Sequence, residues 1–165
     1  MNLLKPGFLG GVVLSAALLL ASCDETVTPQ QQLEIDKEVI RTYAAEKGLS
    51  GTFTTSGLYY VIEKEGVGTE RPTSTSLVEI IYTGSLLDSA GTVFDSSNGF
   101  PYTTNGQLPQ LNVFIAGWVE GVQLFKRESK GILLIPSGLA YGTRGSGSIP
   151  PNTVLRFDIE LIDFE

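Results

Sequence analysis

The sequence contains no histidine and a single cysteine, Cys23, in 165 residues. Without histidine there is no imidazole for acid–base catalysis, and the serine–histidine and cysteine–histidine pairs of common hydrolases are excluded. The usual zinc sites need histidine or several cysteines, so we expect no metal. A lone cysteine cannot form a disulfide within the chain. These absences favour a function that requires neither a nucleophile nor a cofactor.

Positive charge is also scarce, with 11 Lys and Arg against 18 Asp and Glu and a net charge of −7. Such an acidic chain has no electrostatic attraction for phosphate backbones, so we expect no nucleic-acid partner. The length suits one domain with its own core and some additional segments. The 19 glycines suit a β-rich fold with many turns.

Residues 1–22 have the pattern of a secretory signal peptide. Lys5 is the only charge before a run from Phe8 to Leu20 that is apolar apart from small residues, and more small residues follow the run. The run is too short to cross a bilayer comfortably, because a spanning helix needs about 20 apolar residues. We therefore expect this segment to direct export and then be removed.

The end of this segment, Leu-Ala-Ser-Cys at positions 20–23, resembles a bacterial lipoprotein processing site. The resemblance implies cleavage before Cys23 and attachment of acyl chains to that residue, with residues 23–28 as a tether. Two or more chains would hold the protein stably on a membrane. We therefore expect a membrane-anchored lipoprotein of the bacterial cell envelope. The alternative is an ordinary secretory peptide with an incidental cysteine.

Residues 29–56 are expected to form a helix and a linker. Thr28 and Pro29 suit the cap and first position of a helix, and Gly48 can end it. Five residues share one stripe at helical spacing: Ile35, Val39, Ile40, Tyr43 and Ala44. The stripe either packs on the following domain or forms a dimer contact. We favour the first interpretation, and hence a monomer.

The rest of the chain alternates between β-rich runs and turns. Expected strands cover Leu58–Lys64, Leu77–Thr83, Lys130–Ile135 and Thr153–Phe164, and a short helix opened by Gly117 covers Trp118–Phe125. The last run has apolar residues at every second position, which is typical of a half-buried antiparallel strand. Several strands with one short helix indicate an α+β fold.

Six short motifs follow one another in this region. They are Ile81-Tyr82-Thr83-Gly84, Phe94-Asp95-Ser96-Ser97, Gly117-Trp118-Val119-Glu120-Gly121, Ala140-Tyr141-Gly142, Ile149-Pro150-Pro151 and Phe157-Asp158-Ile159-Glu160-Leu161. In this order and spacing, over residues 57–165, they resemble the FKBP-type peptidyl-prolyl cis-trans isomerases. The resemblance implies an antiparallel sheet, a half-barrel curled around one short helix, with a pocket between them.

The resemblance also implies the site residues. The expected catalytic residues are Tyr82, Phe94, Asp95, Trp118, Tyr141 and Phe157. The expected substrate-binding residues are Tyr102, Phe114, Ile115 through its backbone N–H, and Ile149. Two features depart from the family pattern. Phe114 stands where a smaller β-branched residue is usual, and the Gly/Ser-rich loop at 142–148 lacks a bulky residue before Ile149.

The implied activity is rotation about X-Pro bonds in exported proteins during their folding. This reaction breaks no covalent bond and needs no cofactor or metal, which agrees with the missing histidine. The implied partners are proline-containing polypeptides and macrolide inhibitors. One alternative is a catalytically weak module of the cell envelope that binds peptides or acts as a chaperone. A second is a structural lipoprotein in which substitutions in the pocket would have no effect.

Overall fold

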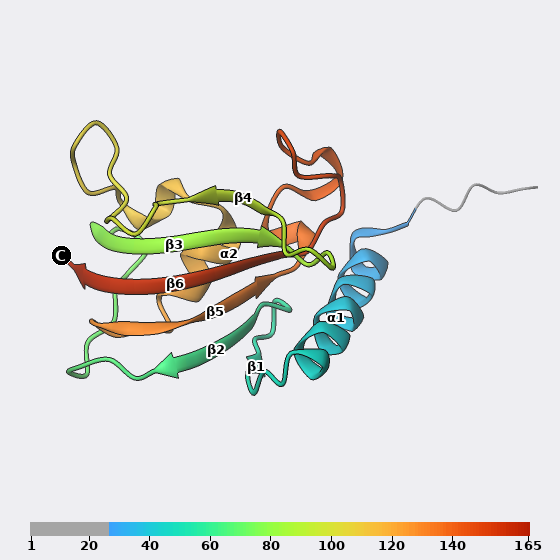
Figure 1. The fold of residues 1–165 in the computed structure, drawn as a ribbon, viewed down its shortest axis with the longest axis horizontal. Helices are drawn as coiled ribbons and strands as arrows, with labels where there is room; N and C mark the ends of the chain where they lie inside the picture. Colours follow the sequence, from blue (N-terminus) through green and yellow to red (C-terminus); the bar gives the residue numbers. More distant parts are fainter. Residues whose placement is uncertain (1–26) are drawn as a thin grey trace, which may run out of the picture.

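The structure is a computed structural model that describes residues 27–165; the expected signal peptide and Cys23 lie outside this part. Its centre is one antiparallel sheet with the strand order β1-β2-β5-β6-β3-β4 (Figure 1). The strands are β1 (Thr52–Phe53), β2 (Tyr59–Lys64), β3 (Val78–Leu86), β4 (Val93–Ser96), β5 (Ser129–Ile135) and β6 (Leu155–Phe164). The sheet is open, with β1 and β4 at its edges, and the expected α+β fold is confirmed.

Two α-helices accompany the sheet: α1 (Pro29–Glu46) and α2 (Ala116–Val122), of which α2 lies behind the sheet in Figure 1. Three 3-10 turns complete the structure: η1 (Leu111–Val113), η2 (Ser137–Leu139) and η3 (Gly142–Arg144). Within residues 27–165, no helix combines the length and the hydropathy that a membrane crossing requires.

The two helices contribute to separate cores on opposite faces of the sheet. Successive side chains of a strand point to opposite faces, so Leu133 and Ile135 of β5 face one way and Ile132 and Leu134 the other. The first pair packs in the core that contains Trp118 of α2, and the second pair packs in the core that contains residues of α1. Strand β5 is therefore buried on both faces.

Helix α1 begins and ends as its sequence predicts. The Thr28 hydroxyl accepts a hydrogen bond from the backbone N–H of Gln31, whose side chain accepts one from Thr28 N–H, so the two form a capping box. Gly48 follows the helix at a φ of +64°, a conformation that glycine adopts without strain.

The apolar stripe of α1 is only partly buried. Ile40 and Ala44 are buried against the sheet, which confirms that the helix packs on the domain. Ile35 and Val39 are 49% and 43% exposed, contrary to the expectation of one continuous buried stripe. The helix meets the sheet along a narrower face than the stripe, and Ile35 and Val39 lie at its edge beside Leu87.

The other expected elements are present with shifted ends. Strand β3 continues past the expected end at Thr83 to Leu86, because β6 offers pairing along its whole length. The short helix runs over residues 116–122 rather than 118–125. It ends early because Leu124 and Phe125 donate to carbonyls three residues back, which is the tighter 3-10 pattern.

Candidate active site

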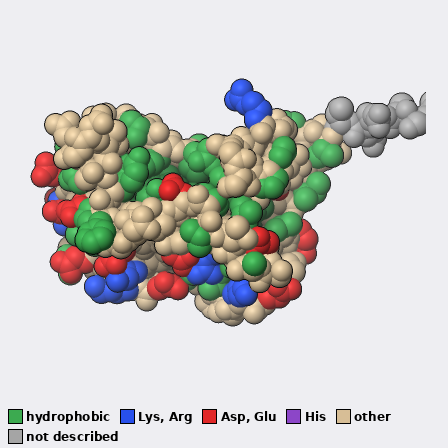
Figure 2. All heavy atoms as spheres, turned by 45° about the horizontal axis from the view of Figure 1, so that its top comes forward, with side chains coloured by type: hydrophobic (Ala, Val, Ile, Leu, Met, Phe, Trp, Pro, Cys, Tyr) green, Lys and Arg blue, Asp and Glu red, His purple; other side chains and the backbone are tan. Residues whose placement is uncertain are grey.

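A cavity of about 340 Å³ lies between α2, the sheet and the connecting loops. Its lining residues are Tyr82, Phe94, Asp95, Tyr102, Val113, Phe114, Ile115, Trp118, Tyr141 and Phe157. Nine of these were expected from the sequence, including all six residues expected to be catalytic. Figure 2 shows charged side chains mostly along the lower part of the visible face, with one acidic group near its centre and one basic group at its top edge. Seven of the ten lining residues are aromatic, so the cavity is an aromatic one.

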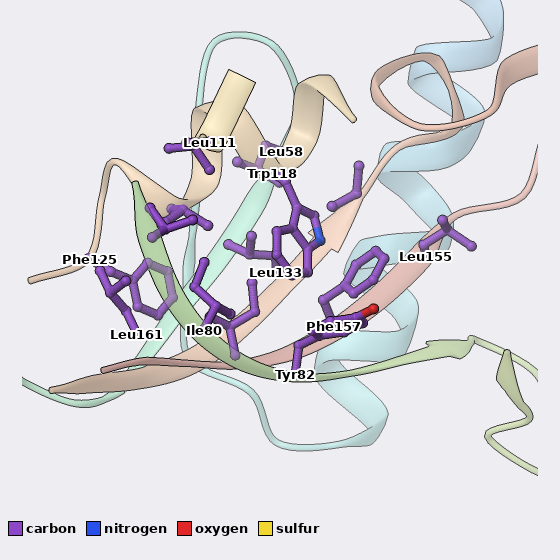
Figure 3. Close-up of a cluster of buried hydrophobic side chains, with 14 of the residues drawn as sticks. Leu58, Ile80, Tyr82, Leu111, Trp118, Phe125, Leu133, Leu155, Phe157 and Leu161 are labelled. Atoms are coloured by element: carbon purple, nitrogen blue, oxygen red, sulfur yellow. The ribbon is translucent and has the colours of Figure 1, made fainter. Parts of the chain in front are cut away.

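Trp118 forms the floor of this cavity and is only 2% exposed. Its ring centroid lies 5.0 Å from that of Tyr82 and 5.2 Å from that of Phe157, and both rings are nearly perpendicular to it. Figure 3 shows the three side chains side by side. Phe114 stacks on it, with 4.8 Å between the ring centroids. Edge-to-face and stacked pairs are favourable beyond simple burial. The floor is therefore held rigidly from three sides.

Gly84 of β3 explains how the wall of the cavity can form. Phe94 and Phe157 meet edge to face with ring centroids 5.6 Å apart. A Cβ atom at Gly84 would lie 2.7 Å from the Phe94 ring and 2.8 Å from the Phe157 ring, closer than carbon atoms normally approach. The glycine of the Tyr-Thr-Gly motif therefore leaves the space in which this aromatic pair packs.

Among residues 27–165, Asp95 is the only charged side chain that lines the cavity. Its Oδ2 atom accepts a hydrogen bond of 2.7 Å from the Tyr82 hydroxyl, and its Oδ1 atom accepts one of 2.8 Å from Ser96 N–H. The two bonds fix the orientation of the carboxylate. Burial, followed by the hydrogen bond and negative charge of Asp95, raises the pKa of Tyr82 far above its usual value. Burial and the charge of Asp95 also raise the pKa of Tyr141.

The raised pKa of Tyr82 predicts a loss of stability in alkali. In the unfolded chain this phenol ionises near pH 10, whereas in the folded chain it stays protonated well above that pH. The protonated phenol contributes fully to the free energy of unfolding below pH 10. This contribution is lost as the pH rises further, because the unfolded state then releases a proton that the folded state retains. Urea midpoints at pH 8, 10 and 11 should fall in that order.

The variant Tyr82→Phe is the control for this prediction, since it removes the titrating group. Its urea midpoint should be lower at pH 8, because the partly buried hydrogen bond to Asp95 is lost. Its midpoint should fall less between pH 10 and 11 than that of the unchanged chain. Equal slopes for the two proteins would contradict the role of Tyr82 in the alkaline transition.

Several hydrogen-bond donors at the cavity have no protein partner among residues 27–165, and one of them is the buried indole N–H of Trp118. No acceptor binds the hydroxyl of Tyr141, and no backbone carbonyl accepts the N–H of Ile115. Ile115 is the N-cap of α2 and has extended backbone angles. The Tyr141 hydroxyl and the Ile115 N–H can therefore donate to the carbonyls of a bound peptide.

Ile149 is the one expected residue that does not line the cavity. Its side chain is 7% exposed and packs in the core cluster that also contains Trp118. Its backbone exchanges two hydrogen bonds with Ser146, which close the Gly/Ser-rich loop. Its role in substrate binding stays a prediction.

Val113 lines the cavity but was not expected from the sequence. It lies on η1 next to Phe114, and its side chain is 67% exposed. Only its position next to Phe114 could have pointed to it, because no motif covers the η1 turn.

Comparison with known proteins agrees with this geometry. Residues 68–162 match the model of the family described as FKBP-type peptidyl-prolyl cis-trans isomerase. The chain is 47% identical over 131 residues to the FKBP-type peptidyl-prolyl cis-trans isomerase FkpA of Aeromonas hydrophila. The match covers 78% of this chain and 45% of that protein, so the matched part spans less than half the length of this relative.

Many solved structures are similar to this fold. The crystal structure of FkpA from Escherichia coli matches with a TM-score of 0.67 and 36% identity, over 82% of this chain and 60% of that one. A peptidyl-prolyl cis-trans isomerase from Pseudomonas syringae matches with a TM-score of 0.65 and 29% identity, over 85% and 98% of the two chains.

Proposed function

Because the chain belongs to the FKBP-type peptidyl-prolyl cis-trans isomerase family, we propose that it catalyses cis–trans isomerisation of X-Pro bonds in polypeptides. The observation that carries this proposal is a cavity lined by seven aromatic side chains, with one oriented carboxylate. Among these side chains are Tyr82, Phe94, Phe157 and Trp118, with Phe114 stacked on the last, and the carboxylate is that of Asp95.

The barrier to this reaction comes from resonance in the peptide bond and amounts to about 18–20 kcal/mol. A twisted amide has lost this resonance and separates less charge than a planar one. An apolar cavity that excludes water therefore favours the twisted state over the planar state, and only such differential binding accelerates a reaction. A ten-thousandfold acceleration needs only about 5.5 kcal/mol.

The cavity residues have separate roles in this proposed mechanism. The rings of Trp118 and Phe157 would enclose the proline ring on the cavity floor. The hydroxyl of Tyr141 and the N–H of Ile115 would donate to substrate carbonyls on either side of the bond and hold the backbone while it rotates. Asp95, fixed by Tyr82, lies beside the cavity where its charge can interact with the twisted amide.

A direct test is prolyl isomerisation of a peptide with an apolar residue before proline, using the purified full chain in mild detergent. We expect clear acceleration at micromolar enzyme. Tyr141→Phe and Asp95→Ala should each lower kcat/KM by about 2- to 100-fold, because each removes one polar contact at an apolar site. Tyr60→Phe, a hydroxyl removed outside the cavity, should have no effect. No acceleration by the unchanged chain would refute the proposal.

A second candidate function is peptide binding with little turnover. It is favoured by Phe114, whose ring stacks on Trp118 and occupies space at the cavity. On this hypothesis, a proline peptide binds the chain without being isomerised, and Phe114→Val raises turnover and macrolide affinity by widening the cavity. Turnover by the unchanged chain that equals or exceeds that of the variant would exclude this function.

We also propose that the protein acts in the bacterial cell envelope on exported chains, held there by lipid on Cys23. The support is the sequence of residues 1–23, since Cys23 follows a signal-like segment. Mass spectrometry of the mature N-terminus should find an acylated Cys23, and Cys23→Ser should leave the protein soluble or uncleaved. An unmodified Cys23, or cleavage at another residue, would contradict the proposal.

A further inference from the structure

Helix α1 contributes one buried charge to the domain. Asp36 is 1% exposed, although it lies on a helix that otherwise packs through apolar residues. Its Oδ2 atom accepts hydrogen bonds from the backbone N–H of Ser137 at 2.7 Å and from the Ser137 hydroxyl at 2.6 Å. Its Oδ1 atom accepts a third bond of 2.7 Å from the side-chain amide of Gln32. The carboxylate is therefore well bonded.

Helix α1 is also attached to the domain by contacts other than the hydrogen bonds of Asp36. Ile40 and Ala44 already bury apolar surface against the sheet, and Arg156 donates to the Tyr43 hydroxyl at 3.0 Å. Burying a carboxylate costs free energy even when it is hydrogen-bonded. An apolar side chain of similar size in its place often makes a protein equally stable. What the carboxylate adds is a fixed position for the backbone of Ser137.

Ser137 begins the segment that leads to the candidate active site. It is the first residue of η2, and Tyr141 follows four residues later. Within this segment Leu139 N–H donates to the Pro136 carbonyl, and Ala140 N–H donates to that of Ser137. A displacement of Ser137 is therefore passed along a short, hydrogen-bonded turn to Tyr141.

The Tyr141 side chain depends on that backbone. Its hydroxyl has no hydrogen-bond partner among residues 27–165, and 36% of the residue is exposed. Its place at the cavity is therefore set by where the segment from Ser137 puts its Cα atom.

We propose that Asp36 is a positioning residue that holds Ser137, and through it the Tyr141 hydroxyl, in the place that substrate binding requires. This inference rests on the proposed isomerase function. It makes α1 a part of the active-site support and couples the helix next to the expected membrane tether to the cavity.

The test is a double-mutant cycle on kcat/KM at a temperature where all variants are folded, with the full chain in detergent. Asp36→Ala should lower kcat/KM about tenfold, the effect of one lost hydrogen bond. In a Tyr141→Phe background the same substitution should have little further effect, because the hydroxyl that it misplaces is already absent. Equal losses in both backgrounds would overturn the proposal.

Two further variants separate positioning from stability. Asp36→Asn keeps an acceptor for Ser137, and the Gln32 amide can turn to accept from it, so this variant should restore kcat/KM to within about twofold. Tyr43→Phe breaks the other polar contact of α1 and should lower the melting temperature without changing kcat/KM. A loss of activity in Tyr43→Phe equal to that in Asp36→Ala would show that any loosening of α1 suffices.

Should Asp36→Ala fail to fold, Ser137→Ala takes its place in the cycle. It removes one of the two Ser137 donors and should give a smaller loss that also disappears in the Tyr141→Phe background. A normal kcat/KM for Tyr141→Phe alone would instead refute the role given to Tyr141, and with it the route from Asp36. The proposed isomerase activity would survive that result.

Discussion

Replacing Trp118 with alanine is expected to lower the free energy of unfolding by about 3–5 kcal/mol and to abolish isomerase activity. The side chain is buried, and the rings of Tyr82, Phe114 and Phe157 all pack against it. Its removal leaves a void and frees these rings to move into the cavity. Urea unfolding gives the stability, and prolyl isomerisation at low temperature gives the activity of the folded fraction.

Phe125→Ala is the matched control for this substitution. Phe125 is fully buried in the same core cluster but does not line the cavity. The Phe125→Ala variant should lose a similar amount of free energy of unfolding, about 3–5 kcal/mol. Yet kcat/KM of its folded fraction should stay near that of the unchanged chain. If both variants lose activity in the same proportion, the floor of the cavity has no special role.

Replacing Gly131 with alanine is expected to lower the free energy of unfolding by more than about 3 kcal/mol, which is enough to unfold much of the protein. Gly131 lies in β5 opposite Ile62 of β2. An added Cβ would lie 2.0 Å from the backbone oxygen of Val61 and 3.1 Å from the ring of Phe125. A backbone atom of a paired strand cannot move away without breaking the pairing. Circular dichroism and thermal unfolding would measure the loss.

Gly138→Ala is the corresponding control. A Cβ there would meet no atom within 4 Å, and the backbone has no positive φ. The substitution should leave stability unchanged or raise it by up to about 1 kcal/mol through the lower entropy of the unfolded chain. A melting temperature for Gly131→Ala close to that of Gly138→Ala would contradict the steric argument.

The sequence predicts the fold of this protein well where local patterns determine the structure. The cap at Thr28, the glycine after α1 and the alternation in β6 each follow from nearby residues. Much of the aromatic lining of the cavity was predicted through the order of the motifs, because five of the six motifs contribute a residue to it.

What the sequence could not predict depends on contacts between distant segments. The exposure of Ile35 and Val39 depends on how far α1 reaches over the sheet. The burial of Asp36 depends on Ser137, a residue 101 positions away along the chain. An aspartate on a helix is normally solvated, so nothing in its neighbourhood predicts a buried acceptor.

The position of β6 has a consequence for the order in which the chain can fold. Strands β1, β2 and β5 form one side of the sheet and β3 and β4 the other, and only β6 pairs with both sides. Residues 155–164 therefore have to be available before the two sides can join. A chain still emerging from a ribosome lacks this central strand, so its two half-sheets cannot join until residues 155–164 have been made.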